Sequence, residues 1–384
     1  MQEKDQSKKD IELSIVMPCL NELETIGICI RKAKTFLAEN QVSGEIVVSD
    51  NGSTDGSDKL ARELGARVVY EKEKGYGSAL MKGISEAKGK YIIMGDSDDS
   101  YDFLSIKPFL DKLRRGNDLV MGNRFAGGLQ KGAMPFLNKY IGNPFLSGIG
   151  KLFFKSKVSD FHCGLRGFSK EAYKKMNMQT KGMEFASEMV VKATLLKMNI
   201  AEVPTTLSQD GRSRRPHLRP FNDGWRHLRF LLLYSPRWLF LYPGIALFVI
   251  GLILSLWIFF RVDQKIDVHS MLYSAAAVII GIQLFTLSIY SKVFAFHEGL
   301  IPENPFIDRM ISKFSLEKGL FFGGFILAIG IAIGIYTFIV WQEGTFFDMG
   351  IRITLRYVIL SFLFIILGFH TIISSFFFSF LKIN

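Results

Sequence analysis

Long apolar runs make up the last third of the chain, and they constrain its fold more than any other feature. A bilayer-spanning helix needs about 20 mostly apolar residues. Four stretches meet this requirement: Leu239–Phe260, Met271–Ala295, Gly319–Trp341 and Tyr357–Phe380. Packed as core helices of a soluble domain, they would need polar faces, which four such runs in succession do not provide. The sequence therefore predicts an all-α transmembrane region of about four helices over residues 239–384.

Basic residues beside these runs predict the orientation of the region. They precede the first run or lie between the second and third: Arg226, Arg229, Arg237, Lys292, Arg309, Lys313 and Lys318. The positive-inside rule places both segments on the cytoplasmic side. The stretch Phe221–Trp238 mixes aromatic, leucine and basic residues, which is typical of a helix lying in the headgroup region, although an ordinary connector has a similar composition. We expect an integral membrane protein with residues 1–220 in the cytoplasm.

Charge and cysteine content narrow the possible partners. The formal net charge of +11 favours an anionic membrane surface or phosphorylated ligands. No zinc-type spacing or long basic arm points to nucleic acid, and His162 and His217 are interpreted as ordinary histidines. The three cysteines, Cys19, Cys29 and Cys163, give no disulfide framework, which fits a reducing compartment. The polar N-terminus lacks the apolar core of a signal peptide. The oligomeric state stays open, with a homo-oligomer possible.

The first 220 residues alternate between short β-branched runs and helical patterns. The predicted strands are Glu12–Met17, Glu45–Ser49, Arg67–Tyr70, Tyr91–Gly95 and Leu119–Met121. The predicted helices between them are Glu22–Asn40, Asp55–Leu64, Ser78–Lys88 and Leu104–Arg115. Repeated β-α-β order indicates an α/β domain with a mostly parallel, Rossmann-like sheet. Ligands of such sheets bind at the carboxyl ends of the strands.

Polar clusters follow three of these strands where the strands end. The clusters are Pro18-Cys19-Leu20-Asn21-Glu22, Asp50-Asn51-Gly52-Ser53-Thr54-Asp55 and Asp96-Ser97-Asp98-Asp99. Asp96 and Asp98 can turn two carboxylates toward one point, which with substrate phosphates is the usual way to hold Mg²⁺ or Mn²⁺. A capped loop is the alternative. Asp50 can accept hydrogen bonds from a base or ribose.

A glycine pair opens one of the predicted helices. Gly75 and Gly77 lie in Gly75-Tyr76-Gly77-Ser78-Ala79, where the helix N-terminus favours a phosphate and glycine allows close approach of the backbone. A purely structural turn is about equally compatible with so short a pattern. We count Gly75 and Gly77 as candidate nucleotide-sugar contacts.

Together these motifs resemble those of a known enzyme family. PCLNE, DNGSTD and DSDD resemble the motifs of family 2 glycosyltransferases with a GT-A fold. HCGLRGF, GMEFASEM and DGRSRRPHLRPFNDGWRHLRFLLLYSP are similar to a bacterial and archaeal branch that includes dolichyl-phosphate mannose and glucose synthases and polyprenyl-phosphate glycosyltransferases. The resemblance covers residues 12–240. It implies inverting transfer of a hexose from a UDP- or GDP-sugar to a polyprenyl or dolichyl phosphate at the cytoplasmic face of a prokaryotic plasma membrane.

The resemblance also implies residue roles. Pro18, Asn21, Glu22 and Asp50 would line the nucleotide pocket, Asp96 would contact the nucleotide-sugar, and Asp98 would be the main metal ligand. Where polyprenyl-phosphate transferases commonly have Asp-x-Asp-Leu-Gln, this chain has Asp-Ser-Asp-Asp-Ser. Asp99 and Ser100 therefore put a third metal contact in doubt.

Arginines and one glutamate complete the candidate site. Arginine matches phosphate oxygens geometrically, and Arg124, Arg166, Arg212, Arg214 and Arg215 are candidates for an acceptor phosphate or for anionic headgroups. Glu184 and Glu188 lie four apart at the start of a helix. With Asp98 and Arg124, Glu188 is a candidate catalytic residue.

Two other functions compete with transfer to a lipid phosphate. A transferase with a hydroxyl acceptor would need a general base, for which Glu188 is the candidate. A non-catalytic transporter or scaffold that senses nucleotide-sugar would make the acidic pair dispensable. It would also require polar residues inside the spans, and apart from Gln283 these are scarce.

Overall fold

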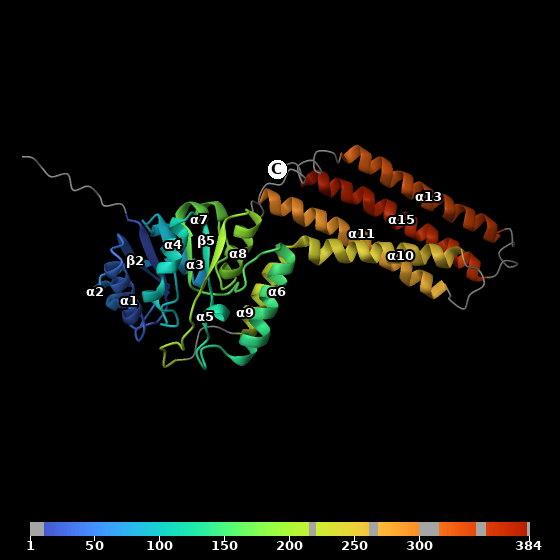
Figure 1. Ribbon diagram of the computed structural model, residues 1–384. Helices are drawn as coiled ribbons and strands as arrows, with labels where there is room; N and C mark the ends of the chain where they lie inside the picture. Colours follow the sequence, from blue (N-terminus) through green and yellow to red (C-terminus); the bar gives the residue numbers. More distant parts are fainter. Residues whose placement is uncertain (1–10, 215–219, 261–267, 299–314, 343–350, 382–384) are drawn as a thin grey trace, which may run out of the picture. The chain divides into compact units, whose positions relative to one another are not determined.

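The computed structural model describes residues 11–214, 220–260, 268–298, 315–342 and 351–381. The chain forms two compact units, with the boundary between Leu231 and Leu232 (Figure 1). The first unit is the α/β domain and the second is all-α.

A seven-stranded sheet forms the centre of the first unit. Its strands are β1 (Leu13–Cys19), β2 (Gly44–Asp50), β3 (Arg67–Tyr70), β4 (Tyr91–Met94), β5 (Leu119–Asn123), β6 (Arg166–Ser169) and β7 (Ile200–Pro204). Their order is β3-β2-β1-β4-β6-β5-β7. Every pair is parallel except those of β6, which runs antiparallel to β4 and β5. The prediction of a mostly parallel sheet is confirmed, and the five predicted strands are all present.

Helices cover both faces of this sheet. They are α1 (Ile26–Glu39), α2 (Ser57–Glu63), α3 (Tyr76–Glu86), η1 (Phe103–Ser105), α4 (Lys107–Arg114), α5 (Arg124–Gly127), η2 (Asn138–Gly142), α6 (Asn143–Phe154), α7 (Lys170–Met176), α8 (Phe185–Leu195) and α9 (Pro220–Leu233). The predicted helix Leu104–Arg115 is split into η1 and α4, with Pro108 in the first turn of α4. Proline favours a helix start because it has no amide hydrogen to donate.

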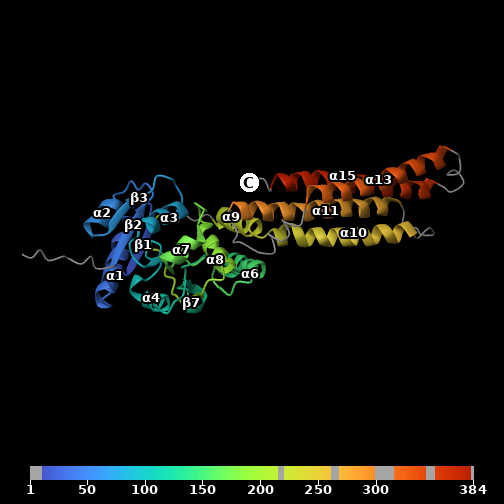
Figure 2. The ribbon, with the colours of Figure 1, turned by 90° about the horizontal axis from the view of Figure 1, so that it is seen from above.

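The main core lies on one face of the sheet. Alternate β1 residues pack there against the apolar sides of α1 and α4, including Ile15, Phe36 and Phe109, all essentially inaccessible to solvent. The helix α3 covers the other face, where a Cβ on Gly83 would lie 2.7 Å from the Val16 side chain. Figure 2 shows α1 and α2 on one side of β1–β3 and α3 on the other. This packing holds the carboxyl ends of the strands in fixed register.

The second unit contains four helices that are long and apolar enough to cross a membrane. They are α10 (Tyr242–Phe260), preceded by a π-helical turn η3 (Arg237–Leu241), then α11 (Val268–His297), α13 (Leu316–Gln342) and α15 (Ile351–Phe380). The four predicted runs are therefore confirmed as helices. Helices α11 and α13 extend beyond both predicted ends, α15 begins earlier than predicted, and α10 ends at the predicted residue. Helix α10 packs on α11, α13 on α15, and α11 on α15.

Candidate active site

The three polar clusters meet at one edge of the sheet, as the strand pattern predicts. Strands β2, β1 and β4 are neighbours, and Cys19 pairs with Asp50 in the register. The clusters are bonded to one another. Ser97 Oγ donates to the Pro18 carbonyl at 2.6 Å, and the Thr54 amide donates to Asn21 Oδ1 at 2.7 Å. The strand ends thus form one polar surface.

Asp50 is buried at the end of β2, and only one of its two carboxylate oxygens accepts hydrogen bonds from the described residues. Its Oδ2 accepts the amides of Gly52 and Ser53 at 3.0 and 3.1 Å. Its Oδ1 is buried and has no hydrogen-bond partner among the described residues. A buried acceptor without a donor costs about 1–3 kcal/mol. An Asp50 oxygen is therefore available to a ligand donor, as expected for a contact to a base or ribose.

The glycine pair before and within α3 has a packing role in this structure. A Cβ on Gly75 would lie 2.2 Å from the Lys181 carbonyl oxygen, and one on Gly77 would lie 2.4 Å from that of Thr180. The amide of Ser78 donates to the Lys181 carbonyl at 3.1 Å. The backbone of residues 180–182 thus sits where we predicted a phosphate. Gly75 and Gly77 are explained by close backbone approach, and their contact with a nucleotide-sugar stays a prediction.

Asp96 follows β4 and lies in a tight environment. Tyr76 donates its hydroxyl to Asp96 Oδ1 at 2.9 Å. A Cβ on Gly164 would lie 2.4 Å from Asp96 Oδ2, so only glycine fits beside this carboxylate. Burial, followed by the neighbouring charge of Asp98, raises the pKa of Asp96 to about 6. Ionising Asp96 close to the Asp98 carboxylate is costly, and a cation bound between the two carboxylates would lower that cost.

Asp98 is oriented by its own loop. Its Oδ1 accepts the Ser100 hydroxyl at 2.6 Å and the Ser100 amide at 3.1 Å. Asp99 has a positive φ of 62° and turns away, so that its carboxylate pairs with Lys32 of α1 at 2.7 Å. The two residues that replace Leu-Gln therefore have distinct tasks: Ser100 fixes Asp98, and Asp99 anchors the loop to α1. The contacts of Ser100 with Asp98 and of Lys32 with Asp99 were not predicted, because both depend on the turn at Asp99.

The acidic pair fits a divalent metal that shares its ligands with a substrate. Among the described residues, no group of three or more His, Cys, Asp or Glu side chains is arranged to hold a metal alone. Mg²⁺ and similar ions are usually held by one or two carboxylates together with substrate phosphates and water. Asp98 Oδ2 already faces a cation, the Arg212 guanidinium at 3.2 Å. The donors and their preference for positive charge both fit Mg²⁺ or Mn²⁺.

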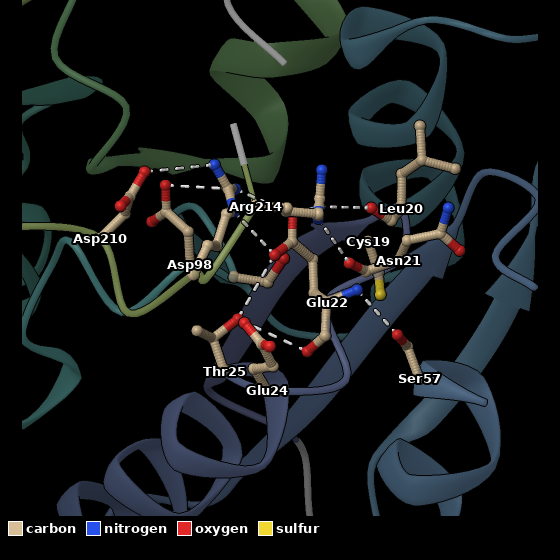
Figure 3. Close-up of polar contacts among 12 residues, drawn as sticks. Cys19, Leu20, Asn21, Glu22, Glu24, Thr25, Ser57, Asp98, Asp210 and Arg214 are labelled. Atoms are coloured by element: carbon tan, nitrogen blue, oxygen red, sulfur yellow. Dashed lines mark hydrogen bonds and ion pairs between the residues drawn. The ribbon is translucent and has the colours of Figure 1, made fainter. Parts of the chain in front are cut away.

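Residues 208–214 lie across the site and bring two predicted arginines to it (Figure 3). The Ser208 amide donates to the Ser100 carbonyl at 3.0 Å, and the Gly211 amide to the Asp98 carbonyl at 2.9 Å. Arg212 donates from Nε to Glu22 Oε2 at 2.8 Å and from Nη2 to Glu22 Oε1, also at 2.8 Å. Arg214 donates to Glu22 Oε1 at 2.8 Å. Glu22 and Asp98 are thereby bridged by a segment about 190 residues away from Glu22 in sequence.

The other two predicted arginines are fully engaged inside the unit. Arg124 is buried and forms a bidentate pair with Asp160, with both N–O distances at 2.7 Å. Each guanidinium nitrogen of Arg166 donates to a backbone carbonyl, those of Cys163, Ala186 and Phe161. Arg166 is inaccessible to solvent, so it braces the fold here. Arg215 lies outside the described residues, and so does His217.

Glu188 is committed to local structure, whereas Glu184 is not. Glu188 is fully buried and accepts from the Gln179 amide, from the amide and hydroxyl of Thr180, and from Lys192 Nζ at 2.8 Å. Both oxygens of this carboxylate are therefore occupied by donors of the same unit. Glu184 precedes α8 as its N-cap, and its Oε2 is buried with no hydrogen-bond partner among the described residues. If an acid in this region acts as a base, the geometry favours Glu184 over Glu188.

Two histidines join α9 to the rest of the unit. His227 Nδ1 lies 2.8 Å from Ser187 Oγ of α8, and His162 Nε2 lies 3.4 Å from the same oxygen. The two rings meet edge to face at 4.5 Å. Burial, with a smaller contribution from the charge of Arg166, lowers the pKa of His227 to about 4. This neutral cluster fixes α9 to α8 and resembles no zinc site.

Comparison with protein families gives two matches on this chain. Residues 14–176 match the model described as glycosyl transferase family 2. Residues 289–382 match the one described as the family 2 glycosyltransferase C-terminal transmembrane region. The two matches fall in the first and second units, respectively.

Individual proteins are similar over much of the chain. The "low-salt glycan biosynthesis hexosyltransferase Agl6" of Haloferax volcanii is 36% identical over 345 residues, which cover 89% of this chain and 83% of that protein. The "dolichyl-phosphate hexose transferase" of the same organism is 28% identical over 56% of this chain and 89% of its own length. Among solved structures, a glucosyl-3-phosphoglycerate synthase from Mycobacterium tuberculosis, crystallised with Mn²⁺, UDP and product, is 22% identical with a TM-score of 0.45, covering 58% of this chain and 77% of that one.

Proposed function

Because this chain belongs to glycosyltransferase family 2 and is an integral membrane hexosyltransferase related to dolichyl-phosphate hexose transferases, we propose that it transfers a hexose from a nucleotide-sugar to a polyprenyl or dolichyl phosphate. The observation that carries the proposal is the contact of Arg212 and Arg214 with Glu22 and Asp98. In the sequence, the segment that carries these arginines precedes α9 and the first span. The two arginines that would bind a lipid phosphate therefore contact the proposed sugar site and lie close in sequence to the first span.

The donor would bind at the strand ends. Asp50 has a free oxygen for a base or ribose donor. Asp96 and Asp98 would hold Mg²⁺ or Mn²⁺, which when bound neutralises the charge that develops on the departing diphosphate. Ser100 keeps the Asp98 carboxylate in place through two hydrogen bonds. This arrangement supports a UDP- or GDP-sugar without distinguishing the base.

The acceptor would be an anionic phosphate oxygen. It attacks the anomeric carbon of the sugar, a new carbon–oxygen bond forms, and the bond to the nucleoside diphosphate breaks, with inversion as the family implies. Such a nucleophile is already ionised near neutral pH and needs no base. That agrees with a Glu188 carboxylate saturated by four donors. Arg212 and Arg214 would turn from Glu22 toward the phosphate, since arginine matches phosphate geometry well.

A hydroxyl acceptor is the competing function. It would require a base, and the unpartnered Oε2 of Glu184 is the observation that favours it. The orientation we propose places the catalytic unit at the cytoplasmic face of a prokaryotic plasma membrane. Basic residues beside the first span support that orientation.

A direct assay separates the two acceptors. The full chain in nanodiscs is supplied with undecaprenyl or dolichyl phosphate and a panel of radiolabelled UDP- and GDP-hexoses, with Mg²⁺ or Mn²⁺. We expect one donor to label the lipid through an acid-labile sugar–phosphate bond, and a chelator to stop the reaction. Label found only in acid-stable glycosides of a hydroxyl acceptor would overturn the proposal.

A further inference from the structure

The helical segment of residues 136–154, which contains η2 and α6 and is here named the η2–α6 segment, exposes an unusual amount of apolar surface. Its exposed side chains are Phe136, Leu137, Tyr140, Ile141, Phe145 and Leu152. Phe136 is 74% exposed and the last four are each 56–58% exposed. Elsewhere among the described residues 11–214, large exposed apolar side chains are isolated: Leu23, Tyr70, Leu104 and Phe125. A contiguous exposed apolar patch on a folded unit usually marks a binding surface.

The exposed patch is separate from the face that α6 uses for packing. Leu137, Ile141 and Phe145 follow at intervals of four and form one stripe on the helical segment. The opposite side is buried, since the Phe161 amide donates to Ser147 Oγ at 3.4 Å and a Cβ on Gly150 would lie 2.5 Å from the Phe161 ring. A helix that is apolar on two sides requires a second apolar environment in addition to its own core.

The charges within this stretch of sequence are all of one sign. Between Gln130 and Ser159 the chain contains no acidic residue. It contains five lysines there: Lys131, Lys139, Lys151, Lys155 and Lys157. Lys139 lies over the Tyr140 ring at 5.1 Å, so a cation borders the apolar stripe directly. Apolar residues flanked only by cations are typical of helices that lie in an anionic membrane surface.

The patch also shares its support with the helix that leads to the membrane. Both views show α6 and α9 beside α8 (Figures 1 and 2), and α9 is held to α8 through His227 and Ser187. Helix α9 exposes Phe221 and Trp225, and only three residues separate its last residue, Leu233, from the first span. Helix α8 therefore contacts both α6 and α9, each of which exposes aromatic residues. Of these two, α9 is followed closely in the sequence by the first span.

We propose that the η2–α6 segment is a membrane-docking surface of the catalytic unit, which inserts its apolar stripe into a bilayer containing anionic lipid. A second copy of this chain is the other possible occupant. Two identical patches facing one another would bring their lysines together, and like charges oppose such pairing. An anionic lipid surface complements both the stripe and its lysines. With the tether after α9, this surface gives the catalytic unit two attachments to the membrane. The inference does not depend on which acceptor the enzyme uses.

A fluorescent label on the stripe tests this docking. The three native cysteines are buried, so Ile141→Cys in the full chain can be labelled selectively with an environment-sensitive dye. In nanodiscs with anionic lipid, we expect blue-shifted emission and loss of most of the fluorescence when the lipids carry a nitroxide. The control is Leu104→Cys, an exposed apolar position on η1 whose dye should stay unquenched.

A second variant separates electrostatic from apolar attachment. The double substitution Lys139→Glu and Lys151→Glu, added to Ile141→Cys, should greatly reduce quenching in anionic nanodiscs. The same two substitutions should have no comparable effect in zwitterionic nanodiscs. Ile141 emission matching that of Leu104, or thiol crosslinking between copies at position 141 without lipid quenching, would overturn the proposal.

Discussion

In the unit before Leu232, buried charges are paired by side chains from distant parts of the chain. In the unit after it, the helices meet through glycines, and several hydroxyls bond back to a carbonyl of their own helix. Arg124 with Asp160 and Arg212 with Glu22 are examples of the first kind. For the second, Thr337 Oγ1 donates to the Ile333 carbonyl four residues earlier.

The contrast follows from the solvent that each unit is built for. In an aqueous unit, a buried ion pair is tolerated when further donors satisfy it, as three do for the Glu188–Lys192 pair. In lipid an unsatisfied polar group is costly, so each helix satisfies its own backbone. Helices then associate by close backbone contact: a Cβ on Gly281 would lie 2.5 Å from the Phe248 amide nitrogen. Buried ion pairs join distant segments in the first unit, whereas small side chains let the helices approach closely in the second.

The strongest test of the candidate active site in the first unit is to remove the charge of the Asp98 carboxylate. We expect Asp98→Asn to lower transfer about a thousandfold, since the developing diphosphate charge loses its counter-ion. The measurement is the initial rate of lipid labelling with saturating donor. Asp111→Asn, at an exposed position on α4, is the control and should stay within about twofold. Comparable rates for both variants would remove Asp98 from the chemistry.

The helix contacts of the membrane unit can be tested with adjacent glycines. A Cβ on Gly323 would lie 2.8 Å from the Ile372 side chain and 3.0 Å from the Gly368 carbonyl, whereas one on Gly324 meets nothing within 4 Å. We expect Gly323→Ala to destabilise the α13–α15 pair by about 1–3 kcal/mol. Gly324→Ala should be neutral or slightly stabilising. Unfolding of both variants in mixed micelles measures the difference, and equal midpoints would contradict close backbone packing.

The histidine cluster makes the stability of the catalytic unit depend on pH. His227 titrates near 4 in the folded unit and near 6.5 when unfolded. A lowered histidine pKa means that stability is fully present above 6.5 and is lost as pH falls toward 4. We expect a loss of about 2 kcal/mol between pH 7 and pH 5 from this residue.

Thermal unfolding of the full chain across that pH range measures the effect. His227→Gln, which does not titrate, should flatten the pH dependence of the unfolding midpoint. The exposed His297→Gln should leave it unchanged. An unaltered slope in His227→Gln would show that other groups cause the loss.

Arg212 gives the smallest expected effect. Its guanidinium lies 3.2 Å from Asp98 Oδ2, the oxygen that a metal would approach. We therefore expect Arg212→Gln to bind Mn²⁺ about tenfold more tightly in the absence of donor, because a competing cation is removed. Electron paramagnetic resonance of free Mn²⁺ measures this without turnover. Arg62→Gln on α2 is an exposed control that should not change the affinity. Weaker binding in Arg212→Gln would show that Arg212 supports the metal site.

Much of the site followed from sequence because its signals are local. Each of the polar clusters of Asp50 and Asp96 directly follows a buried strand, and parallel neighbours bring such ends together. The carboxyl edge was therefore predictable without knowing any contact. Strand β6 was missed, since the side chains of Arg166–Ser169 show no strand pattern. Its antiparallel placement depends on the strands on either side.

By itself, the sequence determined that apolar helices cross a bilayer, that a mostly parallel sheet precedes them, and that acidic clusters share one edge of that sheet. Hydrophobic length and periodicity are properties of neighbouring residues, so they can be read locally. Only the tertiary structure decided which charged side chains are free to bind a ligand and which are occupied by partners within the protein. Arg166 and Glu188 are saturated by local partners, while Arg212 reaches Glu22 across about 190 residues. The free energy of a buried charge depends on the donors and acceptors around it, and long-range folding alone brings those together.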